Sequence, residues 1–447
     1  MKLCWDRVIW AAESHMRIKL AIRHAQPVAD NMILCPQCDL LMALPPLSTG
    51  TKALCSRCST ILITRWEEPY KRSIGYALSA LFMLLLANIF PFITMRVAGF
   101  SNEIKLINIP QVMLEENYAS MATLFMLLVQ LIPALCMLVI ILLCSKVRMP
   151  LVLKEWMAKM LFQFKAWCMV EIFLAGVLVS FVKLMAYGDI GIGSSFVPYC
   201  LFCLLQVRTF QCIDRRWLWR EIEPAPRLNR PLTTGRTGMS QGLRSCRCCT
   251  AILPAEMTHC PRCHTEGYVR RRNSLQWTLA LLMTSAMLYI PANLMPIMVT
   301  EALGNKMNST ILAGVILLWG EGSYPVAMVI FIASIMVPSL KMLAIGWLCW
   351  DANGKGKKRD DSERMHLIYE VVEFVGRWSM IDVFVIAVLS ALVHIGLLMS
   401  VYPATGALLF ALVVILTMFA AMTFDPRLTW DRANETIKKE LPRDGKQ

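Results

Sequence analysis

Eight stretches of about twenty residues are dominated by apolar side chains, and segments rich in polar residues separate them. A helix of about 20 apolar residues is long enough to cross the hydrocarbon core of a bilayer. The pattern therefore predicts eight membrane-spanning helices, near residues 74–95, 119–144, 167–186, 194–212, 275–299, 324–350, 378–398 and 403–423.

The second half of the chain repeats the first. An offset of 205 residues (292 minus 87) aligns the segment 87–91 with 292–296, and both contain Ala-Asn at the start and Pro at the end. A later offset of 211 (378 minus 167) aligns 167–173 with 378–384. Ordered matches of this kind indicate an internal duplication. We expect an α-helical polytopic membrane protein made of two repeats, each with four spans.

Composition and charge support the membrane assignment. Hydrophobic residues make up 57% of the chain and charged residues 17%, whereas soluble domains have roughly a quarter of their residues charged. The net charge of +14 would suit nucleic acid or an anionic membrane surface. The basic residues lie between the apolar stretches, which favours membrane lipids as the partner and not nucleic acid.

The basic residues also predict the orientation. One connection contains Lys146, Arg148, Lys154, Lys159 and Lys165, while the connections on the opposite side of the membrane have few or none. Because cytoplasmic loops collect Lys and Arg, both termini should be cytoplasmic, as an even number of spans allows. Two units of four spans insert the same way up, so the repeats should be parallel.

Two groups of cysteines precede the spans of the two repeats. Each consists of two Cys-x-x-Cys pairs, and the spacer between the pairs is sixteen residues in the first group and ten in the second. Two such pairs supply the tetrahedral Cys4 site of a structural zinc ribbon. The chain should bind two Zn²⁺ ions, one per group. The expected ligands are Cys35, Cys38, Cys55 and Cys58, and then Cys246, Cys249, Cys260 and Cys263.

Other interpretations of the cysteines stay open at this point. Cys248 lies beside Cys249, but only Cys249 keeps the two-residue spacing. A redox Cys-x-x-Cys normally accompanies a βαβ pattern, which we do not find. Iron–sulfur ligation also uses four cysteines. A ribbon that simply braces the cytoplasmic face is the structural alternative.

The domain organisation follows from these elements. It comprises an N-terminal arm, 1–31; a first zinc ribbon, 32–72; a first transmembrane repeat, 73–212; a linker with the second ribbon, 213–273; a second transmembrane repeat, 274–424; and a cytoplasmic tail, 425–447.

Several polar side chains fall inside the predicted spans, where ionisable groups are costly and are candidates for function. Alternatively, those near the cytoplasmic ends pair with adjacent basic residues such as Lys165 and Arg377, or extend to the interface. The candidates for a polar transport network are Glu171, Lys183, Ser334, Lys341, Ser379, Asp382 and Thr417.

The chain resembles the paraquat-inducible protein A family. The residues that carry the resemblance are the Cys-x-x-Cys pairs and the segments 84–92, 180–188, 377–382 and 424–427, and it extends over nearly the whole chain from about residue 33. The resemblance implies a Gram-negative inner-membrane component that works with an MCE-domain tunnel protein. It also implies phospholipid as the cargo and a contribution to envelope integrity and stress resistance.

No GxxxxGK[ST] nucleotide-binding motif is present. Active transport would then depend on an ion gradient or on another subunit, and we expect no enzymatic activity. Two other classes of function stay open: a membrane regulator whose zinc ribbons sense metal or oxidants, and a membrane thiol oxidoreductase.

Overall fold

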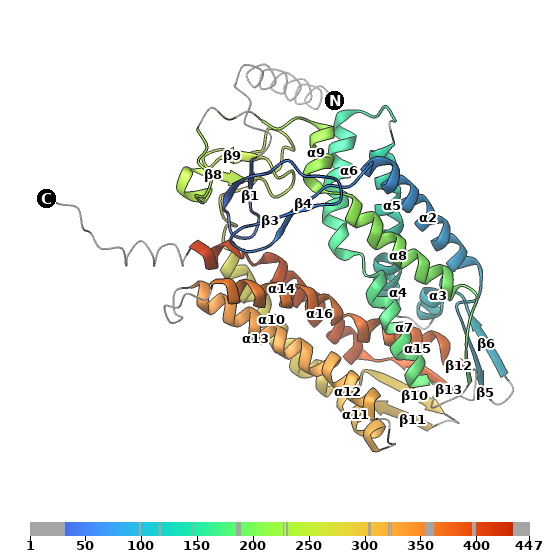
Figure 1. Cartoon of the computed structure of the whole chain (residues 1–447). Coiled ribbons are helices and arrows are strands. Elements are labelled where there is room, and N and C mark those ends of the chain that lie inside the picture. The colour runs from blue at the N-terminus through green and yellow to red at the C-terminus, as the bar shows by residue number, and fades with distance from the viewer. Residues whose placement is uncertain are drawn as a thin grey trace, which may run out of the picture. The chain divides into compact units, whose positions relative to one another are not determined.

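The computed structural model describes residues 32–97, 100–115, 118–145, 147–184, 189–226, 228, 231–302, 305–320, 322, 324–353, 362–395 and 399–431. Most of them are helical (Figure 1). The chain divides into two compact units. The first consists of the described parts of Met1–Pro69, Arg148–Phe162 and Cys212–Arg272, and the second of the described parts of Tyr70–Val147, Gln163–Gln211 and Asn273–Gln447.

The first unit contains both cysteine groups, in short antiparallel hairpins. Strand β1 (Met32–Leu34) pairs with β2 (Leu41–Ala43), β3 (Lys52–Leu54) with β4 (Ile61–Thr64), and β8 (Leu243–Ser245) with β9 (Ile252–Pro254). A short helix, α9 (Arg215–Ile222), begins at Asp214, whose carboxylate accepts a hydrogen bond from the Arg216 amide. This is the usual way to satisfy a free N–H at a helix start.

The two ribbons share one apolar core. Leu34 and Leu41 of the first ribbon pack with Leu243 and Ile252 of the second, and Leu228 of the linker completes the cluster. A two-stranded hairpin has too little apolar surface to be stable alone. The ribbons, predicted as parts of separate domains, therefore lie in one compact unit.

The long apolar helices belong mostly to the second unit, although the stretch from Leu151 to Phe162 belongs to the first. Within the described residues, seven helices are long and apolar enough to cross a membrane, and the bent pair α8 (Phe196–Cys212) and α9 would make an eighth. The seven are Pro69–Ile89, Ala119–Cys144, Leu151–Phe181, Ser274–Leu294, Ala327–Ala352, Arg364–Leu392 and Thr405–Asp431. All eight predicted spans therefore correspond to a helix, which makes the chain a multi-pass membrane protein.

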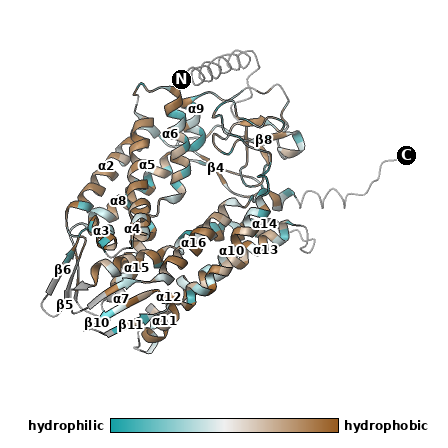
Figure 2. Ribbon diagram, turned by 180° about the vertical axis from the view of Figure 1, so that it is seen from behind, coloured by the Kyte–Doolittle hydropathy of each residue, from teal (hydrophilic) through white to brown (hydrophobic). Residues whose placement is uncertain are grey.

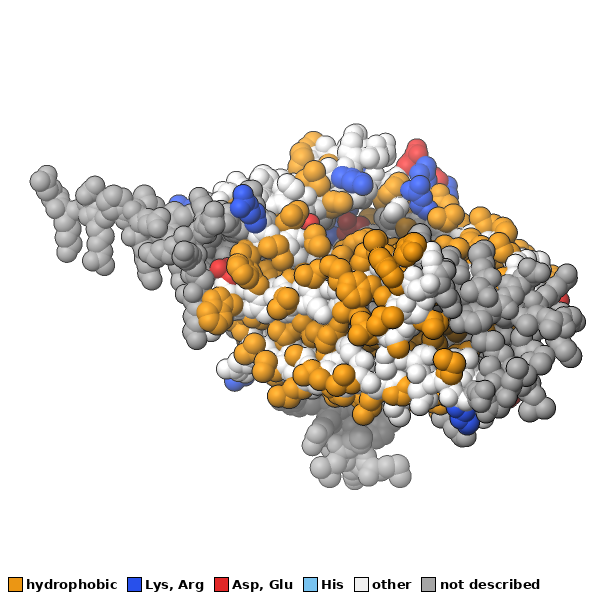
Figure 3. Space-filling model, turned by 90° about the horizontal axis from the view of Figure 1, so that it is seen from below, with side chains coloured by type: hydrophobic (Ala, Val, Ile, Leu, Met, Phe, Trp, Pro, Cys, Tyr) orange, Lys and Arg blue, Asp and Glu red, His pale blue; other side chains and the backbone are white. Residues whose placement is uncertain are grey.

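The long helices are coloured hydrophobic over most of their length in Figure 2. Many of their large apolar side chains are exposed, as a lipid environment requires. In α10 (Ser274–Leu294) the buried positions are mostly small or polar, including Ser274, Thr278 and Ser285, whereas Met287 and Ile290 are 69% and 64% exposed. A helix of a soluble protein has the opposite distribution. Small residues at helix contacts are typical of membrane bundles. Figure 3 shows a face of the molecule covered largely by hydrophobic side chains.

The helix boundaries differ from the prediction where prolines intervene. The predicted span 74–95 is helix α2 (Pro69–Ile89), and 275–299 is α10, which ends at Leu294. Pro91 and Pro296 follow these ends directly, and proline cannot donate the backbone hydrogen bond that would continue a helix. The polypeptide then turns into a β-strand in both halves.

Two small sheets therefore stand where the prediction had loops. The first has the order β6–β5–β7 and the second β11–β10–β13–β12, and both lie at the same end of the helices (Figures 1 and 2). The strands of the first sheet are β5 (Ile93–Val97), β6 (Phe100–Ile104) and β7 (Asp189–Ile192); those of the second are β10 (Met298–Ala302), β11 (Asn305–Ser309), β12 (His394–Ile395) and β13 (Met399–Pro403). Several of these strands do alternate apolar and polar residues, as in β5, where Ile93, Met95 and Val97 alternate with Thr94 and Arg96. Each strand has at most five residues, and the first residues of β5 and β10 fall inside predicted spans.

Two other predicted spans belong to longer helical stretches that begin earlier than expected, at Leu151 and Arg364. The basic connection before the third span is largely helix α6 (Leu151–Phe164), followed by a 3₁₀ turn, η2 (Lys165–Trp167), and α7 (Val170–Leu184). The seventh span, predicted as 378–398, is α14 (Ser362–Trp378) followed by α15 (Ile381–Leu392). Lys154, which was expected in a basic connection between spans, therefore lies in a helix.

Helix α15 lies at the centre of the second unit, and every residue from Ile381 to Leu392 is buried. It packs on α7, the corresponding helix of the first half. Phe173 and Phe384, which the 211-residue offset aligns, contact each other edge to face with ring centroids 5.8 Å apart. A Cβ atom on Gly176 would lie 3.3 Å from Cβ of Phe384, so the glycine allows this close approach.

The remaining helices of the unit surround this pair. In the first half they are α3 (Asn108–Glu115), α4 (Ala119–Phe125), η1 (Met126–Leu131) and α5 (Ile132–Cys144); in the second they are α11 (Ile311–Gly320), α12 (Tyr324–Phe331), η4 (Ile332–Met336), α13 (Val337–Ala352) and α16 (Thr405–Thr423). Both η1 and η4 are π-helical turns.

Candidate metal centres and polar cluster

The same local turn occurs at all four Cys-x-x-Cys pairs. The residue after each second cysteine has a positive φ: 61° at Asp39, 57° at Ser59, 58° at Thr250 and 54° at His264. Its amide donates to the carbonyl of the first cysteine, at 2.8–3.0 Å. This left-handed turn aims both thiols of a pair to one side. Since Cys249 precedes Thr250, the turn selects Cys249 over Cys248.

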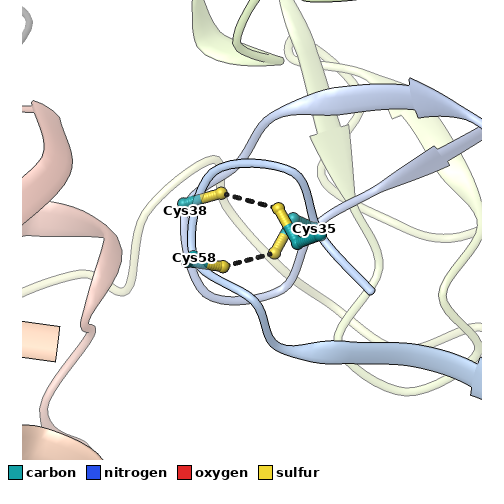
Figure 4. A group of neighbouring side chains, drawn as sticks. Cys35, Cys38 and Cys58 are labelled. Atoms are coloured by element: carbon teal, nitrogen blue, oxygen red, sulfur yellow. Dashed lines mark hydrogen bonds between the residues drawn. The ribbon is translucent and has the colours of Figure 1, made fainter. Parts of the chain in front are cut away.

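The four thiols of each ribbon converge. Figure 4 shows the first group, with Cys35, Cys38 and Cys58 labelled. The Sγ atoms of Cys35 and Cys58 lie 3.5 Å apart, as do those of Cys38 and Cys55. The second ribbon has distances of 3.4 Å and 3.5 Å between the corresponding sulfurs. Within each group all sulfurs lie within 4.8 Å of one another. Four sulfurs about 2.3 Å from a zinc ion would be about 3.8 Å apart, so both groups could hold a metal ion.

Protons are shared within the second group of thiols. Hydrogen bonds from Cys249 and Cys260 lower the pKa of Cys246 to about 7. Hydrogen bonding to Cys246 and Cys260 raises the pKa of Cys249. A metal ion that binds such a cluster replaces these protons, which is the chemistry expected of thiolate ligands.

An ion pair fixes the first ribbon to the second. Nη2 of Arg270 lies 2.8 Å from Oδ2 of Asp39, and the two side chains are 12% and 2% exposed. Oδ2 also accepts a hydrogen bond from the Met239 amide at 3.1 Å. Asp39 follows the ligand candidate Cys38 directly, so the metal-binding turn itself contacts the segment of the other ribbon. Sequence reasoning missed this pair, because nothing in the spacing links residues 231 positions apart.

A second candidate site lies within the membrane-spanning helices. Lys341 of α13 is 2% exposed, and its Nζ donates to the Gly376 carbonyl oxygen at 3.2 Å and to Oγ1 of Thr417 at 3.1 Å. Gly376 lies in the last turn of α14, and Thr417 belongs to α16. Lys341 and Thr417, both candidates for the polar network, therefore contact each other. Gly376, which supplies the carbonyl oxygen, was not among the predicted residues.

Ser334 and Asp382 line a nearby groove. Its cavity has a volume of about 120 Å³. Apolar side chains of α11, α15 and the second sheet form most of its wall, including Leu317, Ile386 and Val401. Both polar residues are at least 93% buried. The groove therefore connects a carboxyl group and a hydroxyl group inside the helices with the β-sheet end of the unit.

The other predicted network residues lie apart from these contacts. Ser379 is buried in the turn between α14 and α15, and its hydroxyl makes no hydrogen bond with the described residues. Glu171 is exposed in the first turn of α7. Lys183 belongs to α7, but its side chain lies outside the described residues. The places of Lys341 and Ser379 are taken in the first half by Cys136 and Cys168, whose sulfurs are 3.8 Å apart.

The fold and the two sites define a class: a polytopic membrane protein with paired Cys4 ribbons and a buried polar cluster. The family model described as paraquat-inducible protein A matches residues 70–223 and 275–434. The chain belongs to this family. The two matched segments start 205 residues apart (275 minus 70) and end 211 apart (434 minus 223), the same offsets that relate the repeated motifs.

Curated relatives extend the comparison to the ribbons. The chain is 69% identical to "Intermembrane transport protein PqiA" of Escherichia coli (strain K12) over 408 residues, which are 91% of this chain and 97% of that protein. It is 29% identical to "Lipophilic envelope-spanning tunnel protein A" of the same strain, covering 89% and 90%. A "Probable intermembrane transport protein" of Haemophilus influenzae is 28% identical, covering 89% and 95%. No solved structure significantly matches the chain.

Proposed function

We propose that this chain is the inner-membrane component of a system that carries phospholipid between the two membranes of a Gram-negative envelope. The observation that carries the proposal is the 69% identity to a protein named for intermembrane transport, over 97% of its length. A more distant relative is named for a lipophilic tunnel that spans the envelope. A lipophilic cargo agrees with the apolar groove of the second unit.

The proposal includes an orientation. Both termini and both ribbons face the cytoplasm, because Lys and Arg concentrate in the segments next to the ribbons. The two sheets then face the periplasm. The halves are parallel repeats of four spans, and the contact between the aligned residues Phe173 and Phe384 supports an axis between them.

Each ribbon holds one Zn²⁺ in this proposal, through Cys35, Cys38, Cys55 and Cys58 or through Cys246, Cys249, Cys260 and Cys263. Closed sites with four cysteines are structural sites. The zinc ions would therefore stabilise the cytoplasmic unit and leave the transport chemistry to the helices.

The polar cluster would couple transport to proton movement. The cluster belongs to the second repeat and comprises Lys341, Thr417, Ser334, Ser379 and Asp382. Burying a lysine or an aspartate inside a membrane costs free energy, so such residues are candidates for function. Burial opposes the charged form of such groups, so each can exchange a proton when water reaches it. The groove leads from Ser334 and Asp382 toward the sheets. Lipid moving along this groove would change the access of water to the cluster.

The partner in this proposal is an MCE-domain tunnel protein that meets the sheet end of the second unit. The test is a transfer assay. Vesicles of phosphatidylethanolamine and phosphatidylglycerol, with a fluorescent phospholipid, contain the purified chain, and the purified soluble tunnel protein is added. We expect labelled lipid on the tunnel protein only when the chain is present. Equal transfer from vesicles without the chain would contradict the proposed function.

A further inference from the structure

The second span of each half contains a π-helical turn at the same place. The amide of Ile132, the residue after η1, donates to the carbonyl of Leu127 within the turn. The amide of Val337, the residue after η4, likewise donates to the carbonyl of Ile332. Each hydrogen bond joins an amide to the carbonyl five residues before it, whereas in an α-helix the interval is four residues. The pairs differ by the 205-residue offset, so the duplication kept the feature. Single π-turns within α-helices occur frequently at functional sites.

A proline after each turn explains why it forms. Pro133 and Pro338 stand one residue beyond the donating amides. In a regular α-helix the ring of Pro338 would collide with the carbonyl of Ser334, four residues before it. The nitrogen of Pro338 has no hydrogen, so it could not donate a hydrogen bond to that carbonyl. The wider turn takes one extra residue and relieves the collision without breaking the helix.

The extra residue also keeps one face of the sixth span buried. From Ala327 to Ile345, its buried positions among the described residues are Ala327, Ile330, Ser334, Pro338, Lys341 and Ile345. Each step through the turn, from residue 330 to 334 and then to 338, is four residues. A regular α-helix advances about 100° per residue, so two such steps overshoot two full turns by about 80°. The π-turn absorbs much of this rotation and holds Ser334 and Lys341 on the same side.

Among the described residues, hydroxyl groups bind this turn in the second half and not in the first. The carbonyl oxygen of Ile335 accepts a hydrogen bond from the Tyr289 hydroxyl at 3.1 Å and another from Oγ of Ser339 at 2.8 Å. The two hydroxyls lie 3.1 Å from each other. The aligned residues of the first half, Leu84 and Ala134, carry no hydroxyl. The half that contains Lys341 is thus the half with the added bonds.

We propose that Tyr289 and Ser339 are positioning residues that hold the π-turn of the sixth span and thereby keep Lys341 beside Thr417 and Gly376. Tyr289 belongs to α10, so its bond also ties the turn to the neighbouring helix. Pro133 alone accompanies the corresponding turn of the first half, so the hydroxyls are not needed to form the turn. They fix its geometry, and a looser turn would let α13 rotate relative to α12 and move the Lys341 ammonium away from both oxygens. The inference rests on the proposed role of the Lys341 cluster in transport.

The test removes the two hydroxyls and little else. The variants are Tyr289→Phe, Ser339→Ala and the double variant, and a Tyr289→Phe variant with Ser339→Thr restores one hydroxyl. Thr284→Val is the matched control, because the Thr284 hydroxyl lies on the same helix but bonds only the Ala280 carbonyl at the exposed surface. Lys341→Met is measured alongside. The readouts are lipid transfer and hydrogen–deuterium exchange of the peptides covering residues 325–345.

We expect the double variant to lose at least tenfold in transfer, with faster amide exchange confined to the segment around residues 332–340. The Ser339→Thr combination and Thr284→Val should both retain transfer near the wild-type rate. Loss in the double variant without rescue by Ser339→Thr would overturn the positioning role. Wild-type transfer by the double variant, when Lys341→Met fails, would also overturn it and leave the proposed function intact. If Lys341→Met transfers lipid normally, the proposed cluster fails, and this inference fails with it.

Discussion

At the scale of single residues, the buried ammonium group of Lys341 imposes the strictest demands on its surroundings. It has two neutral oxygen partners, the Gly376 carbonyl and the Thr417 hydroxyl. Hydrogen bonds to a charged group contribute about 1.5–3 kcal/mol each, and leaving a buried donor without a partner costs at least as much. The packing around these oxygens should therefore tolerate little change.

Gly376→Ala tests this packing. A Cβ atom at residue 376 would lie 3.0 Å from both Cε and Nζ of Lys341, which is tighter than ordinary contact. The lysine must then shift away from the Gly376 carbonyl, and we expect lipid transfer to fall several-fold while the protein still accumulates in the membrane. Gly346→Ala is the control, because its nearest contact is the Leu282 side chain at 3.5 Å. Equal transfer by Gly376→Ala and Gly346→Ala would contradict the packing argument.

The cysteine ligands give a second residue-scale prediction. Cys249→Ser should lower the zinc content of the purified chain from about two ions to about one, because a structural site needs all four thiolates. Cys248→Ser, one residue away, should leave it unchanged, since the left-handed turn at Thr250 aims Cys249 into the cluster. Metal analysis by mass spectrometry measures both. Iron in place of zinc, or equal loss in both variants, would exclude the proposed sites.

These two examples show what the sequence could predict about the sites. Spacing alone identified the eight cysteines and separated Cys249 from Cys248, because the ligands of a turn are local. It also identified Lys341 and Thr417 as charged or polar residues inside spans. It could not find Gly376, whose contribution is a backbone carbonyl, or the Asp39–Arg270 pair, which depends on how two distant hairpins pack.

At the scale of elements, the two ribbons should act as one cooperative module. Their hairpins share the core around Leu41 and Leu243, and the ion pair of Asp39 with Arg270 lies beside Cys38. Breaking a buried ion pair on one side costs about 3–5 kcal/mol, because a charge is left without its partner.

Asp39→Ala should therefore loosen both metal sites, although it changes no ligand. We expect a chelator to remove zinc faster from each ribbon, by roughly tenfold or more. Glu256→Ala serves as a control on an exposed acidic residue of the same unit. If Asp39→Ala accelerates zinc loss from the first ribbon only, the ribbons are independent modules.

The elements also show why span boundaries were harder to predict than spans. Apolar length predicted all eight helices, since each buries or exposes a long hydrophobic surface. The strands that follow α2 and α10 begin with apolar residues that continue the apolar stretch of the helix, and Pro91 and Pro296 mark the transition. In the sequence, the only trace of the π-turn is that two successive buried positions of the sixth span are separated by four residues each time.

At the scale of the whole molecule, the proposed orientation places the ribbons and the sheets on opposite sides of the membrane. Reporter insertions test it directly. Alkaline phosphatase, which is active only in the periplasm, should be inactive when inserted at Thr237 and active when inserted in the hairpin between β10 and β11. The opposite pattern would overturn the orientation and the proposed contact with a periplasmic partner.

The central claim is that lipid transfer depends on the buried charges of the second repeat. The most direct measurement is the lipid-transfer rate of the variant that combines Lys341→Met with Asp382→Leu. Its control combines Lys306→Met with Glu301→Leu, which removes an ion pair on the exposed β10–β11 hairpin. A purely structural pair of buried charges can often be replaced by apolar residues with little loss. The account predicts that both variants fold and bind zinc, and that only the buried variant loses transfer. Normal transfer by the Lys341→Met, Asp382→Leu variant would contradict it.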